Sequence, residues 1–494
     1  MKEYKSSILR GLSSDGILFI LTILIGFATI PIYLNFITLD ELGIYFTMQG
    51  IIAVISLADI GLPMYSLKKL SNKNFFNSDE LMLYLSSAQI FQYILGCILL
   101  ILGLIVYYYL NSIIKVNFEY LQSAKNLFLY SWFSIVITVL FGLNASILRS
   151  RHELSLVNIS IFLILFFSTL LNMVWLYLGH GIEMFGISLL VSTTIVEIYF
   201  IYSVYSKHGI NILMPTVYQS KYIKDGWDYI KKFQLIRISQ ASKTSLFTVL
   251  LSSYAGHSIV AQYNITNKIP QMIPAFISKI IINIFPSLSE LFETNNKDII
   301  RVYYKSIFKI GILITIFSFS AIYSLNELFI TLWVGHDKFI GGGVFLFILI
   351  NFIILILISF SGIIINSSGE FKHTPMISIL ELFILLFLSN VLFNIYGLIG
   401  LFMGYSLSMM VGLIYSYYII NIILNVNLLK WIKEVMQTCF IYILIAIFIN
   451  LIINNLDMSN IIKFIVLFFM YIGIFGITYY LEFRKLWGVF NERN

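Results

Sequence analysis

One apolar segment, at about residues 233–255, carries polar and basic side chains that could form a binding site. At 100° per residue, a single helical face would hold Gln234, Arg237, Gln240, Thr244 and Thr248. Lys243 lies about 120° from the centre of this face, within reach of its long side chain. A face with cations cannot point into lipid, so it must line a water-filled cavity or meet polar partners. The alternative is that Arg237 alone anchors the segment at the membrane surface.

The next apolar segment, at about 258–287, combines polar side chains with helix-breaking residues. The polar residues are Asn264, Asn267, Lys268, Gln271 and Lys279. Lys268 lies near the middle of the segment, where its ammonium group cannot easily reach the membrane surface. Pro270 and Pro274 predict a kinked or broken helix, which is common at transporter sites. The alternative is a purely structural kink with Lys268 paired to a carboxylate.

Four acidic residues lie within or beside the apolar segments. They are Asp15, Asp59, Glu197 and Glu381. Asp15 and Asp59 lie near segment ends, where capping of a helix explains them as well as a function does. Glu197 and Glu381 lie deeper, and either could pair with Arg237 or Lys243 or carry protons. Glu197, Glu381 and Asp59 are therefore candidates for proton or ion coupling.

Motifs for catalysis or cofactor binding are not found. The sequence contains no Walker A motif, no CxxC and no HExxH, and its six His residues are scattered. Cys97 and Cys439 lie in apolar runs without the spacing of a disulfide framework or a metal site. We therefore expect neither an enzyme nor a bound metal or cofactor. The formal charge of +7 is spread over the loops, so it does not indicate nucleic-acid binding.

The composition requires a lipid environment for the elements that carry these residues. Hydrophobic residues make up 59% of the 494 positions and charged residues only 11%, whereas soluble domains average about 25% charged. Long continuous apolar runs recur between short polar breaks, which predicts transmembrane helices rather than a β-barrel. We expect an all-α polytopic membrane protein with about fourteen transmembrane helices. They are predicted at about 12–35, 43–65, 81–110, 126–148, 154–178, 182–206, 233–255, 258–287, 306–332, 341–365, 376–396, 398–421, 436–453 and 461–481.

The distribution of basic residues supports an even number of spans. With the N-terminus in the cytoplasm, 23 of the 31 Lys and Arg residues fall in cytoplasmic segments, and only Lys115, Lys125, Lys338 and Lys463 fall outside. This asymmetry is the positive-inside pattern. A wrong span count would reverse the two sides downstream of the error. The pattern therefore predicts that both termini are cytoplasmic.

The longest polar break, at 207–232, divides the predicted spans. It carries five Lys residues and Pro215, and we expect it to lie along the cytoplasmic membrane surface as a partly amphipathic linker. The predicted organisation is a six-helix bundle at 1–206, the linker at 207–232, a second six-helix bundle at 233–424 and an extra helix pair at 425–494.

Three stretches resemble a known family of transporters. They are LDELGIYFTMQGIIAVISLADIGLPMYSLKKLS (Leu39–Ser71), GHSIVAQYNITNKIPQMIPAFISKIIINIFPSLSELFE (Gly256–Glu293) and LWVGHDKFIGG (Leu332–Gly342). They are similar to Wzx-type polysaccharide (O-antigen) flippases of the multidrug/oligosaccharidyl-lipid/polysaccharide exporter superfamily. The resemblance extends over essentially the whole chain, but its signals are distributed and include no single sharp motif.

The resemblance implies two six-helix lobes with two extra helices in the bacterial plasma (inner) membrane. It also implies that an undecaprenyl-diphosphate-linked oligosaccharide is carried to the outer leaflet by alternating access through a cationic cavity. Arg237, Lys243 and Lys268 could bind the diphosphate, and Gln234, Gln240 and Asn264 could bind the sugar. By analogy, the partners would be membrane lipid, a polysaccharide polymerase and a chain-length regulator.

Two other functions remain open on the sequence alone. The first is a drug or cation antiporter of the same superfamily, although such antiporters usually have twelve spans and sites that attract cations. The second is a membrane enzyme such as a polysaccharide polymerase. Polymerases carry a sizeable external loop, whereas the longest external break here, at about 111–125, is short.

Overall fold

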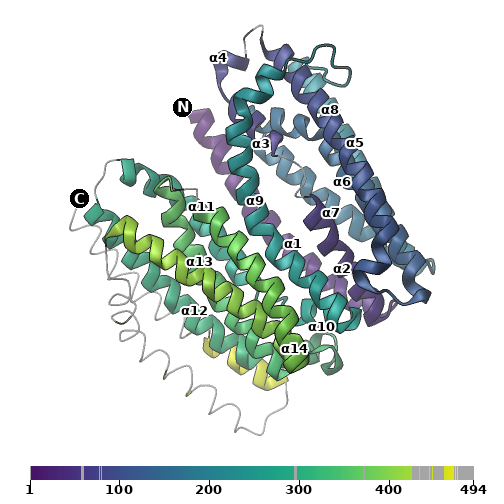
Figure 1. Cartoon of the computed structure of the whole chain (residues 1–494), viewed down its shortest axis with the longest axis vertical. Coiled ribbons are helices and arrows are strands. Elements are labelled where there is room, and N and C mark those ends of the chain that lie inside the picture. The colour runs from purple at the N-terminus through teal and green to yellow at the C-terminus, as the bar shows by residue number, and fades with distance from the viewer. Residues whose placement is uncertain are drawn as a thin grey trace. The chain divides into compact units, whose positions relative to one another are not determined.

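The computed structural model describes most of the chain. The described residues are 2–56, 61–76, 78, 80–293, 297–370, 373–425 and 461–471, with 433, 444, 448, 473 and 476. Side chains are described for all of these except 2–15, 73, 232–233, 235–242, 279–280, 282–287, 293, 297–298, 303, 307 and 310. In this part of the chain the regular elements are helices, without strands (Figure 1). Eight of the described helices are long and apolar enough to cross a membrane, which confirms the predicted all-α polytopic membrane fold.

The chain divides into two compact units, Met1–Ala261 and Gln262–Asn494. The boundary falls inside one helix, α10 (His257–Thr266). The predicted domain organisation stays a prediction. It comprises bundles at 1–206 and 233–424, a linker at 207–232 and a helix pair at 425–494. Almost all of the predicted span 436–453 lies outside the described residues. A helix is present at Ile461–Tyr471, within the predicted span 461–481.

In its described residues, the first unit is built of nine helices and the start of α10. Their bounds are α1 Lys2–Leu34, α2 Leu39–Ile55, α3 Leu62–Leu70, α4 Lys73–Phe76, α5 Glu80–Ile114, α6 Phe118–Ser150, α7 Leu154–Tyr177, α8 Glu183–His208 and α9 Ser220–Ala255. Helix α6 packs against both α5 and α8, while α9 packs against α2 and α5 (Figure 1). The Trp132 indole on α6 is buried and donates a hydrogen bond of 2.9 Å to the Leu99 carbonyl oxygen of α5.

Local signals explain the ends of several helices. Helix α2 begins with a capping box, in which the Thr38 hydroxyl accepts from the Glu41 backbone N–H at 3.2 Å and the Glu41 carboxylate accepts from the Thr38 N–H at 2.8 Å. The predicted span 43–65 is divided between α2 and α3. Gly61, with a φ of 73°, precedes α3, and Pro63 lies in its first turn. The positive φ favours glycine there, and proline suits a first turn, which needs no N–H partner.

The segment predicted as a surface linker is only partly non-helical. Helix α8 ends at His208, followed by Gly209 with a φ of 66°, and α9 begins at Ser220 rather than at 233. The first turns of α9 bury Tyr222, Ile223 and Ile230 in the core of the first unit. Because these apolar side chains are buried, the helix begins well before residue 233, where the lysine-rich composition had placed its start.

A lysine and three aromatic rings fix the start of α9. The Lys69 ammonium nitrogen of α3 lies 4.5 Å from the Tyr84 ring centroid, 4.6 Å from that of Phe75 and 4.7 Å from that of Tyr222. Each contact is a cation–π interaction. Together they join α3, α4, α5 and α9, so the start of α9 belongs to the packed end of the first unit.

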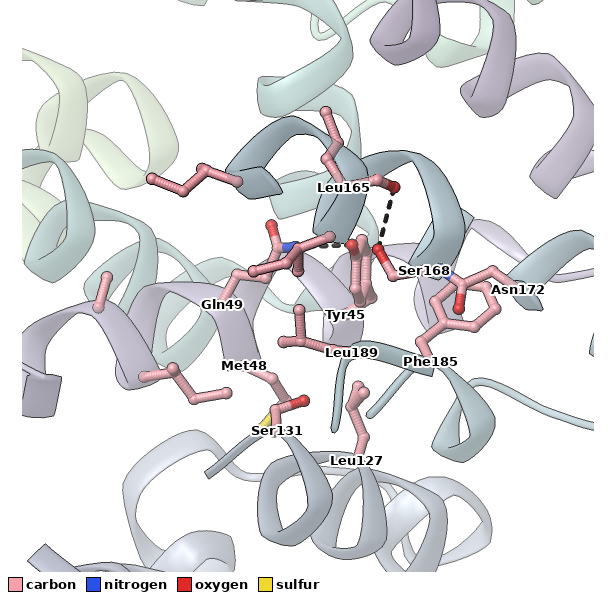
Figure 2. A pocket seen from close by; sticks show the side chains of 14 residues that line it. Tyr45, Met48, Gln49, Leu127, Ser131, Leu165, Ser168, Asn172, Phe185 and Leu189 are labelled. Atoms are coloured by element: carbon pink, nitrogen blue, oxygen red, sulfur yellow. Dashed lines mark hydrogen bonds between the residues drawn. The ribbon is translucent and has the colours of Figure 1, made fainter. Parts of the chain in front are cut away.

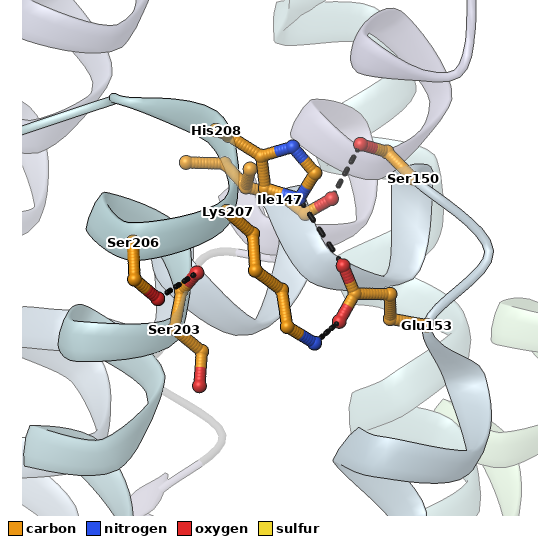
Figure 3. A network of polar contacts seen from close by, with 7 residues as sticks. All are labelled: Ile147, Ser150, Glu153, Ser203, Ser206, Lys207 and His208. Carbon is orange, nitrogen blue, oxygen red and sulfur yellow. Dashed lines mark hydrogen bonds and ion pairs between the residues drawn. The ribbon is translucent and has the colours of Figure 1, made fainter.

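A polar network lies at the same end of this unit, between the end of α8 and the start of α7 (Figure 3). The Glu153 carboxylate lies 2.5 Å from the Lys207 ammonium nitrogen and 3.2 Å from His208 Nε2. The Lys207 side chain is 46% exposed. Exposed ion pairs contribute at most about 1 kcal/mol, so this network orients the end of α8 more than it stabilises the unit.

The second unit consists of long helices that pack around a buried core of its own. Their bounds are α11 Met272–Glu293, α12 Lys297–Trp333, the short 3-10 helix η2 His336–Lys338, α13 Gly342–Ser367 and α14 His373–Leu424. Helix α13 packs against α11, α12 and α14. Gly397, with a φ of 58° and a ψ of −138°, bends α14 between the predicted spans 376–396 and 398–421. The bend confirms that two helical segments meet there.

Candidate functional site

The predicted polar stripe at 233–255 lies on helix α9 of the first unit. Gln234 and Lys243 are half-buried there. The side chains of Arg237 and Gln240 lie outside the described residues. Where α9 meets α2, a Cβ added at Gly50 would lie 3.2 Å from the Ser245 carbonyl oxygen. The close approach of the two backbones fixes this part of α9, and with it the position of the half-buried Lys243.

The predicted break at Pro270 is present, because α10 ends at Thr266 and α11 begins at Met272. Between them, the Asn267 N–H donates to the Tyr263 carbonyl oxygen at 2.8 Å and the Lys268 N–H to that of Ile265 at 3.2 Å. Pro270 has no N–H to continue the helix. Lys268 thus lies on a short turn between two helices.

Lys268 is half-buried on this turn, and Asn264 is half-buried on α10. In the described part of the chain, no carboxylate lies within ion-pair distance of Lys268. Lys268 and Asn264 belong to the second unit, whereas Gln234 and Lys243 belong to the first. A shared cavity for all four residues therefore stays a prediction.

The two deeper acidic candidates are both buried, one in each unit. Glu197 on α8 is 4% exposed, and its Oε2 atom has no hydrogen-bond partner among the described residues. Glu381 on α14 is 1% exposed. Asp59 lies outside the described residues. Both carboxyl groups are therefore shielded from solvent within their own units.

The Glu381 carboxyl group packs closely against Gly412, which lies in the other half of α14. A Cβ added at Gly412 would overlap the Glu381 carboxyl group. Gly412→Ala should therefore displace the carboxylate and lower the free energy of unfolding by about 1–3 kcal/mol, seen as a lower melting temperature. The matched control is Gly362→Ala on α13, where the added Cβ meets nothing within 4 Å. The same loss in both variants would contradict this role of Gly412.

The structure also contains a cavity that the sequence did not predict (Figure 2). It has a volume of about 330 Å³ inside the first unit and is formed by α2, α6, α7 and α8. This size is at the lower end of ligand-binding pockets, about 300–1,000 Å³. The lining residues are Tyr45, Met48, Gln49, Ile52, Ala53, Leu127, Ser131, Ile161, Ile164, Leu165, Ser168, Asn172, Phe185 and Leu189. None of these side chains is charged, so the cavity suits an uncharged group and not a diphosphate.

A few polar atoms are held in this apolar lining. The Gln49 amide donates to the Tyr45 hydroxyl at 2.6 Å, and the Asn172 amide donates to the Tyr33 hydroxyl of α1 at 3.0 Å. Asn172 Oδ1 has no partner among the described residues, although the side chain is only 4% exposed. The sequence signal that was missed is the pair Ser168 and Asn172, which are four residues apart and so share one face of α7.

Comparison with known proteins identifies the class of fold. No family model and no curated protein matches the sequence. Among solved structures, the lipid II flippase MurJ in an inward closed conformation matches with a TM-score of 0.73 at 14% identity, covering 95% of this chain and 99% of MurJ. An inward-facing multidrug resistance MATE family transporter of the MOP superfamily matches with a TM-score of 0.67 at 14% identity, covering 84% of this chain and 98% of the transporter. A MOP superfamily transporter from Pyrococcus furiosus gives a TM-score of 0.57 at 14% identity, with 85% and 96% covered.

The chain therefore has the fold of MOP superfamily transporters and flippases. The multi-pass membrane character predicted from composition is confirmed by the apolar helices and by this fold.

Proposed function

We propose that this protein is a flippase that moves an undecaprenyl-diphosphate-linked oligosaccharide from the cytoplasmic to the outer leaflet of the bacterial plasma membrane. The product would serve the synthesis of O-antigen or another surface polysaccharide. The observation that carries the proposal is the match to a lipid II flippase over 95% of this chain, against 84% for the MATE transporter. The longer match favours a lipid-linked substrate over a small soluble one.

The half-buried Lys268 supports an anionic substrate. An ammonium group that has no ion pair in the described part of the chain is stabilised by an arriving phosphate through charge-assisted hydrogen bonds. In the proposal, Arg237, Lys243 and Lys268 bind the diphosphate, and Gln234, Gln240 and Asn264 bind the sugar. Glu197, Glu381 and Asp59 are the candidates for proton or ion coupling. The proposed topology has both termini in the cytoplasm, and the proposed partners are the polymerase and the chain-length regulator.

A second candidate, an exporter of uncharged drug-like molecules, is favoured by the cavity of the first unit. Its fourteen lining residues carry no charge. This function predicts that deleting the gene sensitises cells to such compounds while leaving surface polysaccharide intact.

The deciding experiment deletes the gene and determines on which leaflet lipid-linked repeat units accumulate. We expect accumulation on the cytoplasmic face, measured by the protection of the units from an external glycosidase or periodate, and recovery with the wild-type gene. Export of unpolymerised single units would instead indicate a polymerase. Normal surface polysaccharide in the deletion strain would contradict the flippase function.

A further inference from the structure

The junction between α9 and α10 is held against α2 by backbone contact. Helix α9 ends at Ala255, Gly256 has a φ of 91°, and α10 begins at His257. A Cβ added at Gly43 of α2 would overlap the His257 carbonyl group. All of these residues belong to the first unit, and α10 continues past Ala261 into the second. The contact with α2 therefore fixes the point from which the chain enters the second unit.

The His257 side chain lies in a polar site formed by α2 and α9. It is 8% exposed, and its Nδ1 atom lies 3.0 Å from the Ser252 hydroxyl and 3.5 Å from the Thr47 hydroxyl. The Thr47 hydroxyl also donates to the Gly43 carbonyl oxygen at 2.8 Å. His257 Nε2 has no partner among the described residues. A neutral ring with its proton on Nδ1 donates to the neighbouring hydroxyls and leaves Nε2 without a proton, so it needs no acceptor there among the described residues. The surroundings therefore fit this neutral tautomer.

Among the described residues, Asp40 is the charged group that acts on this site from the adjoining helices. Asp40, in the first turn of α2, accepts a 3.0 Å hydrogen bond from the Ser258 N–H, the second residue of α10. Glu41 is held in the capping box with Thr38, and α9 contributes the uncharged Ser252. The carboxylate therefore caps the first turn of α10.

We propose that His257 is a proton-sensitive latch, which holds the first turn of α10 on α2 while its ring is neutral and releases it when the ring is protonated. A protonated ring carries an N–H on both nitrogens, and the Nε2–H would then be buried without an acceptor. An unsatisfied buried donor is unfavourable, so protonation favours a position of the ring in water. Release of the ring also breaks the contacts of Ser252 and Thr47 with Nδ1.

The sign of the pH dependence follows from the burial of the ring. Burial lowers the pKa of the His257 imidazole, and the negative charge of Asp40 offsets this only in part. A released ring has an ordinary pKa of about 6.5. Above that pH both states are neutral and the latch is at full strength. As the pH falls below it, the released state gains protons first, so the latch weakens by up to about tenfold per pH unit until the lowered pKa is reached.

A role for this latch in transport rests on the proposed function. The latch itself is independent of that function, because it is inferred from the contacts of His257 alone. In the predicted topology, the α9–α10 junction faces the outside of the cell. Protons from the outside would then release the junction without crossing the membrane. This arrangement would link external pH to the start of the second unit.

Hydrogen–deuterium exchange of the purified full-length protein in nanodiscs tests the latch without substrate. The measured quantity is the protection of the peptide around 256–263, compared at pH 7.5 and 5.5 after correction for intrinsic exchange. In the wild type, we expect protection to fall by up to about tenfold at the lower pH. His257→Phe should keep the same protection at both values. The control His336→Phe, at an exposed imidazole 3.2 Å from Glu327, should behave as the wild type.

A wild type without this fall, or a fall that persists in His257→Phe, would overturn the proposal. Asp40→Asn provides an independent test if the His257 variant does not fold, because Asn can still cap the helix. By the same linkage, loss of the Asp40 charge should lower the pKa of the latched ring further, so the fall in protection should extend to lower pH and become larger in total. A fall of unchanged size would contradict the electrostatic account. Because the assay contains no substrate, its failure is distinguishable from failure of the flippase proposal.

Discussion

Lys268→Gln is expected to reduce export of the lipid-linked oligosaccharide by about 10- to 100-fold at unchanged protein level. Glutamine keeps much of the length of the side chain but removes the positive charge. A hydrogen bond to a charged group contributes about 1.5–3 kcal/mol, which corresponds to this range. The loss should be large because Lys268 is half-buried on the turn between α10 and α11, without an ion pair in the described residues.

The measurement is the rate at which repeat units reach the outer leaflet of cells carrying each variant. Lys338→Gln is the matched control, because Lys338 lies in the short helix η2 and is paired with Asp337. It should export at the wild-type rate, and Lys268→Arg should recover part of the loss. Normal export by Lys268→Gln would remove this residue from the proposed diphosphate site.

Trp132→Ala is expected to have the largest effect on stability. The Trp132 side chain is 1% exposed, stacks on Phe128 at a centroid distance of 5.9 Å and donates to the Leu99 carbonyl oxygen. A Cβ added at Gly103 would overlap the indole, so the indole is packed directly against the α5 backbone. Truncation of a buried Trp costs about 3–5 kcal/mol because it leaves a cavity.

The expected result is a clear fall in the melting temperature of the purified protein or the loss of folded protein from the membrane. Phe133→Ala is the neighbouring control, since Phe133 is 37% exposed and its removal leaves no enclosed cavity. Equal losses in the two variants would show that the contact between α5 and α6 is less important than its geometry suggests.

Much of the fold follows from the sequence because a continuous apolar run long enough to span the lipid must form a helix. The runs at 81–110 and 154–178 correspond to α5 and α7. The break after α10 could be predicted because Pro270 cannot continue a helix. The start of α9 could not, because it depends on burial of Tyr222 and Ile230 among residues distant in the chain. Local composition there indicated a solvated linker.

The candidate site was predictable only in part, because it too depends on contacts between residues distant in the chain. Burial of Glu197 and Glu381 follows from their position inside apolar runs. The glycine that accommodates Glu381, Gly412, lies in the other half of α14, and no local pattern connects the two. His257 and the uncharged cavity were also missed, because both depend on packing between separate helices.

The bend at Gly397 has a consequence for how the protein enters the membrane during synthesis. The two halves of α14 meet within a few residues, and Gly400 faces the Leu392 carbonyl group. From Leu382 to Leu424 the sequence contains no charged residue. Insertion machinery that orients spans by flanking positive charge therefore finds no signal at this turn. We infer that the two spans insert together as one hairpin, oriented by the chain on either side of it.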